Sequence, residues 1–200
     1  LPKSKGTIRI MSHNVSGNFM ANSRTDQVFE RLFAYVSPDI LILEEFCRSS
    51  APGLAGRLET ILGGQWYIFG GLNSGIYQNM IASRFPLKLK SQDTHPPSDV
   101  RGVTAALIDL PDTDFTKDLY VMGLHLQCCN APVFQAQRQR SVDAVIARIK
   151  DLKTQGGQID LPVNTPVIVG GDFNFKGGVQ PQTTLATGDI QNEDLFGPDI

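Results

Sequence analysis

The chain has 200 residues, 41% of them hydrophobic and 19% charged, which suits one substantial core and predicts a single domain over residues 1–200. Its net charge of -2 excludes a global basic field of the kind that draws proteins onto nucleic acid, so any phosphate binding must be local. The apolar runs are too short to predict a transmembrane segment or a signal peptide, and secreted and cytoplasmic locations both stay open.

A strand and a helix are predicted at the start of the chain. Residues 7–15 alternate apolar and polar side chains, as a half-buried strand does, and end in a polar loop. Ser23 and Asp26 then resemble a capping box, which predicts a helix that Pro38 stops. The apolar face of this helix is predicted to consist of Val28, Leu32, Phe33 and Val36.

The next predicted strand ends in acidic groups. Residues 39–46 (DILILEEF) form a continuous apolar run that closes on two carboxylates, which is typical of a strand buried on both faces. A second helix is expected over residues 53–62, because two glycines follow it. Further strands, separated by turns rich in Pro and Ser, are predicted at 65–70, 76–83, 101–110 and 118–126.

The last third of the chain has the clearest helical pattern, over residues 131–153. The apolar face of this helix is predicted to be Val142, Val145, Ile146, Ile149 and Leu152. A short buried strand is predicted at 166–170. Strands outnumber helices and several are joined by short turns, which favours an α/β fold of two mixed sheets packed face to face, with helices outside in a four-layer α/β/β/α sandwich. A doubly wound nucleotide-binding fold is the alternative, but its glycine-rich phosphate motifs are missing.

Polar residues suited to phosphoryl chemistry recur where predicted strands end, and strand ends can gather distant side chains into one cleft. Each has an ordinary explanation as well. An Asp or Asn after a strand usually bonds its own backbone, and a histidine in an apolar strand is ordinarily a hydrogen-bonded core residue. The residues concerned are Asn14, Glu44, Glu45, His125, Asp172 and Asn174.

With these residues, the sequence resembles the endonuclease/exonuclease/phosphatase family, which includes pancreatic deoxyribonuclease, abasic-site endonucleases and bacterial sphingomyelinases. The combination of PDILILEE at 38–45 with GDFN at 171–174 is specific. The resemblance implies a deoxyribonuclease-like fold and a Mg²⁺-dependent hydrolase of phosphoester bonds, with Mn²⁺ as a second candidate cation. The matching segments cover nearly the whole chain: residues 8–15, 37–46, 79–87, 101–111, 119–129 and 167–174.

The resemblance also implies a metal site. Glu45 matches the family's metal-binding glutamate, and a carboxylate is a hard oxygen ligand suited to Mg²⁺. Asn14 matches the asparagine that helps to place metal and phosphate. Glu44 stands where many members have glutamine, and its extra negative charge would favour cation binding.

The remaining roles concern water and phosphate. By resemblance, Asp172 orients or deprotonates the attacking water, Asn174 binds a phosphate oxygen, and His125 contacts phosphate and transfers a proton. Arg101 falls where relatives carry a phosphate-binding arginine, although a surface arginine opening a strand is the ordinary interpretation. Asn79 is a weaker phosphate-binding candidate, because a strand asparagine can simply satisfy neighbouring backbone.

The sequence departs from the family pattern at its end. The pattern closes on Ser-Asp-His, preceded by an orienting aspartate that Asp194 could supply, but no histidine follows Asn174. We therefore expect a domain truncated at the C-terminus, lacking its last strand or strands, and inactive or weak as a fragment. The alternative is a non-catalytic module that binds phosphate or a protein on the same fold.

The sequence does not decide the class of substrate or the pairing of the three cysteines. The expected partner is a phosphoester substrate, either nucleic acid, a phospholipid or a small phosphodiester, and no obligate protein partner is evident. The odd number of cysteines and the missing C-x-x-C spacing disfavour a zinc site. A disulfide between Cys47 and either Cys128 or Cys129 and a set of three thiols are both compatible with the sequence.

Overall fold

The computed structural model describes residues 4, 6–70, 76–93 and 103–199. These residues form two compact units. Unit 1 contains every strand of the described chain and the first two α-helices, and unit 2 contains the three later helices. Unit 1 comprises residues 1–93, 101–125 and 166–172, and unit 2 comprises residues 94–100, 126–165 and 173–200.

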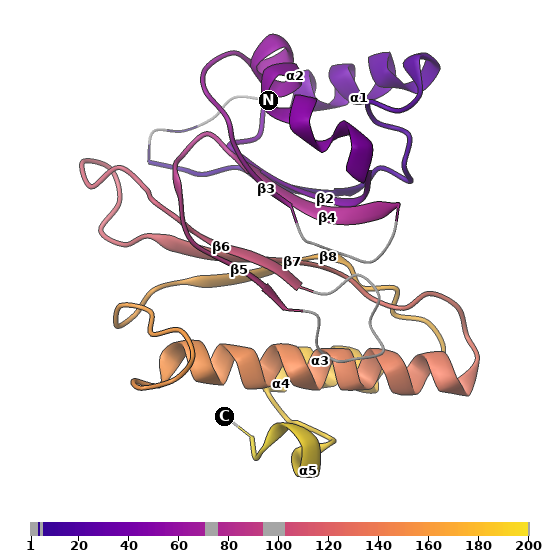
Figure 1. Cartoon of the computed structure of the whole chain (residues 1–200). Helices are drawn as coiled ribbons and strands as arrows, with labels where there is room; N and C mark the ends of the chain where they lie inside the picture. The colour runs from indigo at the N-terminus through magenta and orange to yellow at the C-terminus, as the bar shows by residue number, and fades with distance from the viewer. Residues whose placement is uncertain (1–3, 5, 71–75, 94–102, 200) are drawn as a thin grey trace. The chain divides into compact units, whose positions relative to one another are not determined.

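The first sheet of unit 1 has the strand order β1-β2-β4-β3 and is mixed (Figure 1). β1 runs parallel to β2, whereas β4 runs antiparallel to both β2 and β3. Its strands are β1 (Ile10–Asn14), β2 (Ile40–Cys47), β3 (Tyr67–Gly70) and β4 (Tyr77–Ser83). The strands predicted in this part of the chain are therefore confirmed: three are shorter than predicted, and β2 is shifted by one residue.

The second sheet, also in unit 1, has the order β5-β6-β7-β8. Its first two pairings are antiparallel, and β7 pairs in parallel with β8. Its strands are β5 (Leu87–Asp93), β6 (Val103–Ile108), β7 (Leu119–His125) and β8 (Val167–Asp172). Two mixed sheets accompanied by helices confirm the predicted α/β class.

The two sheets lie face to face (Figure 1). A layer of aliphatic side chains is packed between them. Ile42 of β2 lies at its centre, and the glycines at 123 and 170 on the opposite sheet make room for it. A Cβ on Gly123 or Gly170 would stand 2.8 Å or 2.7 Å from methyl carbons of Ile42. The layer is formed by Ile40, Ile42, Ile81, Ala106, Ile108, Leu110, Leu119 and Val121.

The outer face of the first sheet is covered by α1 (Ser23–Val36) and α2 (Leu54–Leu62), which a 3₁₀ turn, η1 (Arg48–Gly53), precedes (Figure 1). Side chains from both helices join those of β2 and β4 in one buried cluster. Burying apolar surface in this way stabilises the fold by about 25 cal/mol for each Å² removed from water. Its helix members include Phe33, Leu54 and Leu58, and its strand members include Leu41, Leu43, Phe46 and Met80.

The start of α1 differs in detail from the predicted capping box. The N-cap is Asn22, whose side chain accepts a hydrogen bond from the Arg24 amide, and the carboxylate of Asp26 accepts one from Met20. Val28 was predicted on the buried face, but 55% of its surface is exposed. Only Phe33 of the predicted face is fully buried, because the helix rests on the sheet along a narrow stripe.

Unit 2 is built on the long helix α3 (Pro132–Lys153), with α4 (Gln180–Thr187) and α5 (Glu193–Phe196). Val142, Val145, Ile146 and Leu152 of the predicted α3 face are buried. The buried Asp143 carboxylate accepts hydrogen bonds from Gln139 and from the segment that leads into α5, so α3 fixes that segment. No helix in the described part of the chain is both long and apolar enough to cross a membrane.

Candidate active site

Two parallel strand pairs in unit 1 carry the predicted site residues at their carboxyl ends. In the β1–β2 pair, Asn14 lies opposite Glu44. In the β7–β8 pair, His125 lies opposite Asp172. Because both pairs are parallel, each brings two distant parts of the sequence to one edge of its sheet.

A β-bulge in β2 determines how its two glutamates are presented. Leu43 lies opposite Met80 and Phe46 opposite Gln78, so β2 has one residue more than β4 over this stretch. Glu45 is in the left-handed region, with φ of 51°. Strict alternation along β2 would point Glu45 into the buried cluster beneath the helices, on the same face as Leu43. Because of the bulge, Phe46 takes that position instead.

Four side chains from four strands converge. The Asn14 Nδ2 donates hydrogen bonds to Glu45 Oε1 at 3.3 Å and to Asp172 Oδ2 at 3.1 Å. The His125 Nε2 lies 3.6 Å from each of the same two oxygens. The Asn14 Oδ1 accepts from the Ser16 amide at 2.8 Å, which fixes the orientation of this amide group.

The members of this cluster differ in their exposure to solvent. The His125 side chain is 2% exposed, whereas the carboxylates of Glu45 and Asp172 are 22% and 34% exposed. Two carboxylates can therefore meet a ligand from solvent, while one oxygen of each accepts a hydrogen bond from the Asn14 amide and lies near the His125 imidazole. This arrangement suits groups that act on a ligand and does not suit a buried structural network.

Glu44 is buried beside this cluster and is 1% exposed. The Ser12 Oγ donates a 2.8 Å hydrogen bond to its Oε1. Burial raises the pKa of Glu44 from 4.5 to about 7, and repulsion from Asp172 adds to the rise, while the hydrogen bonds from Ser12 and the backbone oppose it. The carboxyl is thus divided between its charged and neutral forms near neutral pH.

The chemistry of these donors fits a hard divalent cation. Glu45 and Asp172 offer partly exposed carboxylate oxygens, which Mg²⁺ and Mn²⁺ accept as ligands. The repulsion between Asp172 and Glu44 is of the kind that a bound cation relieves. Within the described ranges, no three His, Cys, Asp or Glu side chains are gathered as a ready-made metal centre.

Gly171 explains how Asp172 reaches its place. Its φ is 146°, and a Cβ at this position would lie 1.8 Å from the Leu124 carbonyl oxygen. Only glycine can therefore occupy the position while β8 stays paired with β7. Gly171 and Ser12 support the site but were not among the predicted site residues. The first glycine of GDFN was the signal available for Gly171, whereas Ser12 resembles any polar strand residue.

Four further residues were predicted to contribute to the site. Arg101 lies outside the described residues. Asn79 is fully buried in β4, where its backbone carbonyl oxygen accepts from Thr104 Oγ1 at 3.4 Å. Asn174 belongs to unit 2, where its Nδ2 donates to the Leu126 carbonyl at 3.1 Å. Asp194, the candidate orienting aspartate, is exposed in α5.

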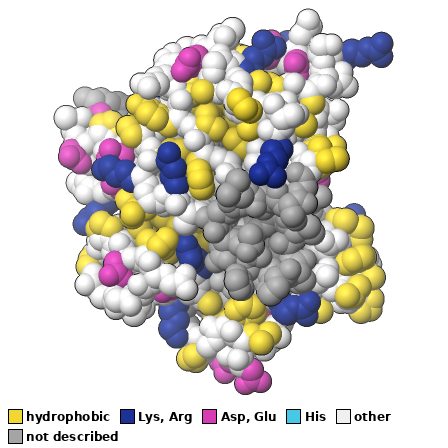
Figure 2. Space-filling view, in the orientation of Figure 1, with side chains coloured by type: hydrophobic (Ala, Val, Ile, Leu, Met, Phe, Trp, Pro, Cys, Tyr) yellow, Lys and Arg dark blue, Asp and Glu magenta, His cyan; other side chains and the backbone are white. Residues whose placement is uncertain are grey.

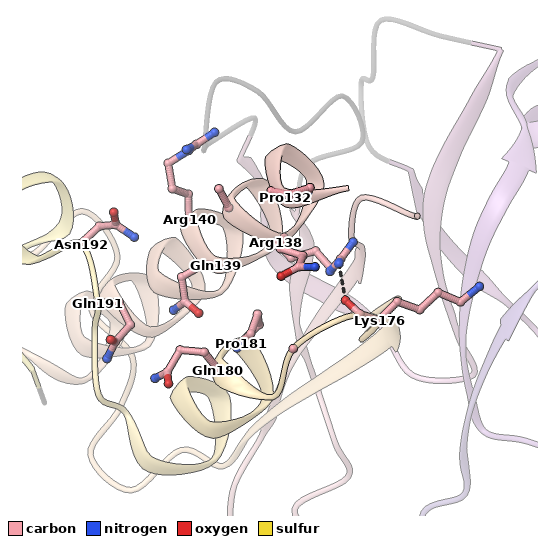
Figure 3. Close-up of a pocket in the computed structure, with 12 residues that line it drawn as sticks. Pro132, Arg138, Gln139, Arg140, Lys176, Gln180, Pro181, Gln191 and Asn192 are labelled. Atoms are coloured by element: carbon pink, nitrogen blue, oxygen red, sulfur yellow. Dashed lines mark hydrogen bonds between the residues drawn. The ribbon is translucent and has the colours of Figure 1, made fainter. Parts of the chain in front are cut away.

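Unit 2 also contains a cavity of about 440 Å³, and none of the predicted site residues lines it. Figure 3 shows the amide side chains around it and the buried Arg138, which donates to the Lys176 carbonyl oxygen at 2.5 Å. Its polar lining includes Gln135, Gln139, Gln180, Gln191 and Asn192. On the face seen in Figure 2, Lys and Arg side chains are scattered and do not form a continuous basic patch.

Comparison with solved structures shows the same fold in proteins of low sequence identity. A humanized variant of D. rerio TDP2 matches with a TM-score of 0.69 and 20% identity over 92% of this chain and 70% of that protein. D. rerio TDP2 in complex with a single-strand DNA product matches with a TM-score of 0.67 and 19% identity, over 90% of this chain and 66% of that one. A β-hairpin deletion mutant of Staphylococcus aureus β toxin matches with a TM-score of 0.63 and 17% identity, over 91% of this chain and 72% of that protein.

A comparison with curated proteins found no match. The model of the Endonuclease/Exonuclease/phosphatase family matches residues 11–190, which include all four strand ends of the site. The family resemblance inferred from the sequence motifs is therefore confirmed. The chain belongs to the endonuclease/exonuclease/phosphatase family.

Proposed function

We propose that this protein is a divalent-metal-dependent phosphodiesterase whose reaction takes place at the strand ends of unit 1. Family and fold indicate a hydrolase of the phosphodiesterase or nuclease type. The observation that carries the proposal is the convergence of Glu45 and Asp172 on the same two side chains, Asn14, which donates to both, and His125, which lies 3.6 Å from both. Convergence of four strands on one small cluster is expected of a functional site.

Mg²⁺ is the proposed cation, with Mn²⁺ as the alternative, and Glu45 is its proposed principal ligand. The neighbouring Asn14 orients the Glu45 carboxylate through its N–H group, and Glu44 adds negative charge once it ionises. When bound, the cation supplies Lewis-acid stabilisation of charge on a phosphoryl oxygen.

The other residues would orient the attacking water, transfer protons and bind the phosphate. Asp172 presents a partly exposed carboxylate that can accept a proton from water, while Asn14 holds one of its oxygens and so fixes its direction. His125, close to both carboxylates, can hold or donate a proton at Nε2. Asn174 and Arg101 are the proposed phosphate-binding groups, and Asn79 is retained as the weakest candidate for that role.

The substrate class follows from chemistry that the family's members share. One similar structure holds a single-strand DNA product, and another is a bacterial β toxin. The proposed substrate is a phosphodiester in nucleic acid, in a phospholipid or in a small molecule. The net charge of -2 favours contacts limited to the reacting phosphate over binding along a long polyanion.

The metal assignment is tested by calorimetric titration with Mg²⁺ and Mn²⁺. We expect Glu45→Gln to weaken binding by more than the ~10–100-fold that loss of an outer partner usually costs, because Gln removes a ligand charge. The control is Glu59→Gln, which makes the same chemical change on the exposed side of α2 and should leave binding unaltered. Equal affinity of wild type and Glu45→Gln would refute the assignment.

A further inference from the structure

Two adjacent cysteines in unit 2 lie in the segment that connects β7 to α3. Cys128 and Cys129 are both exposed, and no disulfide is formed among the cysteines of the described chain. Their Sγ atoms are 2.7 Å apart. This separation is longer than the about 2.05 Å of a disulfide bond but shorter than ordinary contact between two thiols, so the side chains already face each other.

A buried arginine holds the backbone of this pair in place. Arg138 of α3 is 1% exposed, and its Nη1 donates to the carbonyl oxygens of Gln127 and Cys129 at 2.7 Å and 2.8 Å. Its Nη2 donates to the Lys176 carbonyl, the bond drawn as a dashed line in Figure 3. Charge-assisted bonds on both sides of Cys128 fix the peptides that carry the two thiols.

The backbone at Cys129 has a φ of 76°, a left-handed conformation that a cysteine rarely adopts. Such a conformation persists only where surrounding contacts enforce it, and here the bond from Arg138 to the Cys129 carbonyl does so. The thiols are therefore held side by side before any reaction, which removes most of the entropy cost of joining them.

We infer that Cys128 and Cys129 form a reversible redox modification site, which closes to a disulfide by exchange with a small-molecule disulfide such as oxidised glutathione. One cysteine thiolate attacks the small disulfide, forms a mixed disulfide and releases the first small thiol. The second cysteine thiolate then attacks the protein sulfur of the mixed disulfide and releases the second small thiol. The cysteines lose two electrons, and the two protons leave on the small thiols.

The bond would be labile. Adjacent Cα atoms are about 3.80 Å apart across a trans peptide, whereas most disulfides join Cα atoms about 4.4–6.8 Å apart. A bridge between neighbouring residues is therefore strained and easily reduced, as regulatory disulfides are. Cys47 differs, because its Sγ is hydrogen-bonded to Ser49 in unit 1 and has no adjacent cysteine in the sequence.

The test is to treat the chain with oxidised glutathione, alkylate the remaining thiols with N-ethylmaleimide, and measure the intact mass and that of the peptide containing residues 128 and 129. We expect loss of two hydrogen atoms from this peptide with no label on it, and recovery of both labels after dithiothreitol. Cys47→Ser, the matched control, should close in the same way. A wild-type peptide that stays labelled at both positions, or keeps a glutathione adduct, would overturn the inference.

Single variants separate closure from ordinary thiol reactivity. Cys128→Ser and Cys129→Ser should each retain a glutathione adduct, because no second thiol resolves it. Phenylarsine oxide supplies an independent measurement, since its arsenic bonds both thiols of a close pair and releases water. We expect a one-to-one adduct with reduced wild type and Cys47→Ser, and its loss in either single variant. An adduct that survives in both single variants would contradict the assignment of the pair.

Discussion

Glu44 is a buried carboxyl whose pKa is raised to about 7, mainly by burial. Because its pKa in the folded protein lies above the ordinary 4.5, its contribution to stability is fully present below pH 4.5 and is lost as the pH rises through 7. The shift corresponds to on the order of 3 kcal/mol. In the presence of a chelator, the free energy of unfolding of the wild type should fall over this window.

Glu44→Gln tests this prediction, because Gln mimics the neutral carboxyl and keeps an oxygen for the Ser12 hydroxyl. The variant should match the wild type near pH 4.5 and exceed it in stability at pH 8, by urea denaturation in chelator at both pH values. Glu59→Gln on the exposed face of α2 should leave the pH dependence unchanged. The same pH dependence in Glu44→Gln and wild type would show that Glu44 does not titrate with a raised pKa.

At the scale of single residues, the sequence predicted which side chains gather at the candidate site more reliably than it predicted how buried each of them is. The strand-end pattern correctly brought together Asn14, Glu45, His125 and Asp172. It could not tell which of the two adjacent glutamates is buried, because that depends on the extra residue of the β2 bulge. The catalytic roles of these residues stay predictions.

At the scale of elements, Gly171 is a constrained position of β8. We predict that Gly171→Ala lowers the free energy of unfolding by on the order of 3 kcal/mol, because the new Cβ would collide with the Leu124 carbonyl and φ of 146° is strained for alanine. Thermal and urea denaturation measure this loss.

Gly56→Ala is the matched control for this prediction. Gly56 lies inside α2, and a Cβ there meets nothing within 4 Å. The same substitution should therefore stabilise the protein by up to about 1 kcal/mol through helix propensity. If the two variants were equally stable, the close approach of β8 to β7 at Leu124 would not constrain residue 171.

Most elements could be predicted, and the exceptions have physical causes. No strand was predicted at β5, although Leu87 and Leu89 alternate with lysines. A register shift between Lys88 and Ser91 breaks that alternation, and Leu89 has a φ of 41° and is 48% exposed. The short helices α4 and α5 were also missed, because α4 is largely polar and α5 is only four residues long.

At the scale of the molecule, the class of the fold could be predicted but the strand order could not. Hydrophobic patterns show that a segment is buried, whereas pairing depends on contacts between distant segments. The placement of β1 next to β2 and of β8 next to β7 needed the structure. These two non-local parallel pairings bring the residues of the candidate site together, so the family motifs contributed more to the site prediction than periodicity did.

We predict that Asp172 acts on water or phosphate and does not merely support the fold. The measurement is turnover of a chromogenic phosphodiester, single-strand DNA and sphingomyelin with Mg²⁺, for the protein at its natural length. Asp172→Asn should lower kcat by roughly 10²–10⁴-fold, and His125→Ala should also lower it, while melting temperatures change little. Asp112→Asn, at an exposed turn, should retain full activity. Wild-type turnover by Asp172→Asn, or its failure to fold, would contradict this role of Asp172.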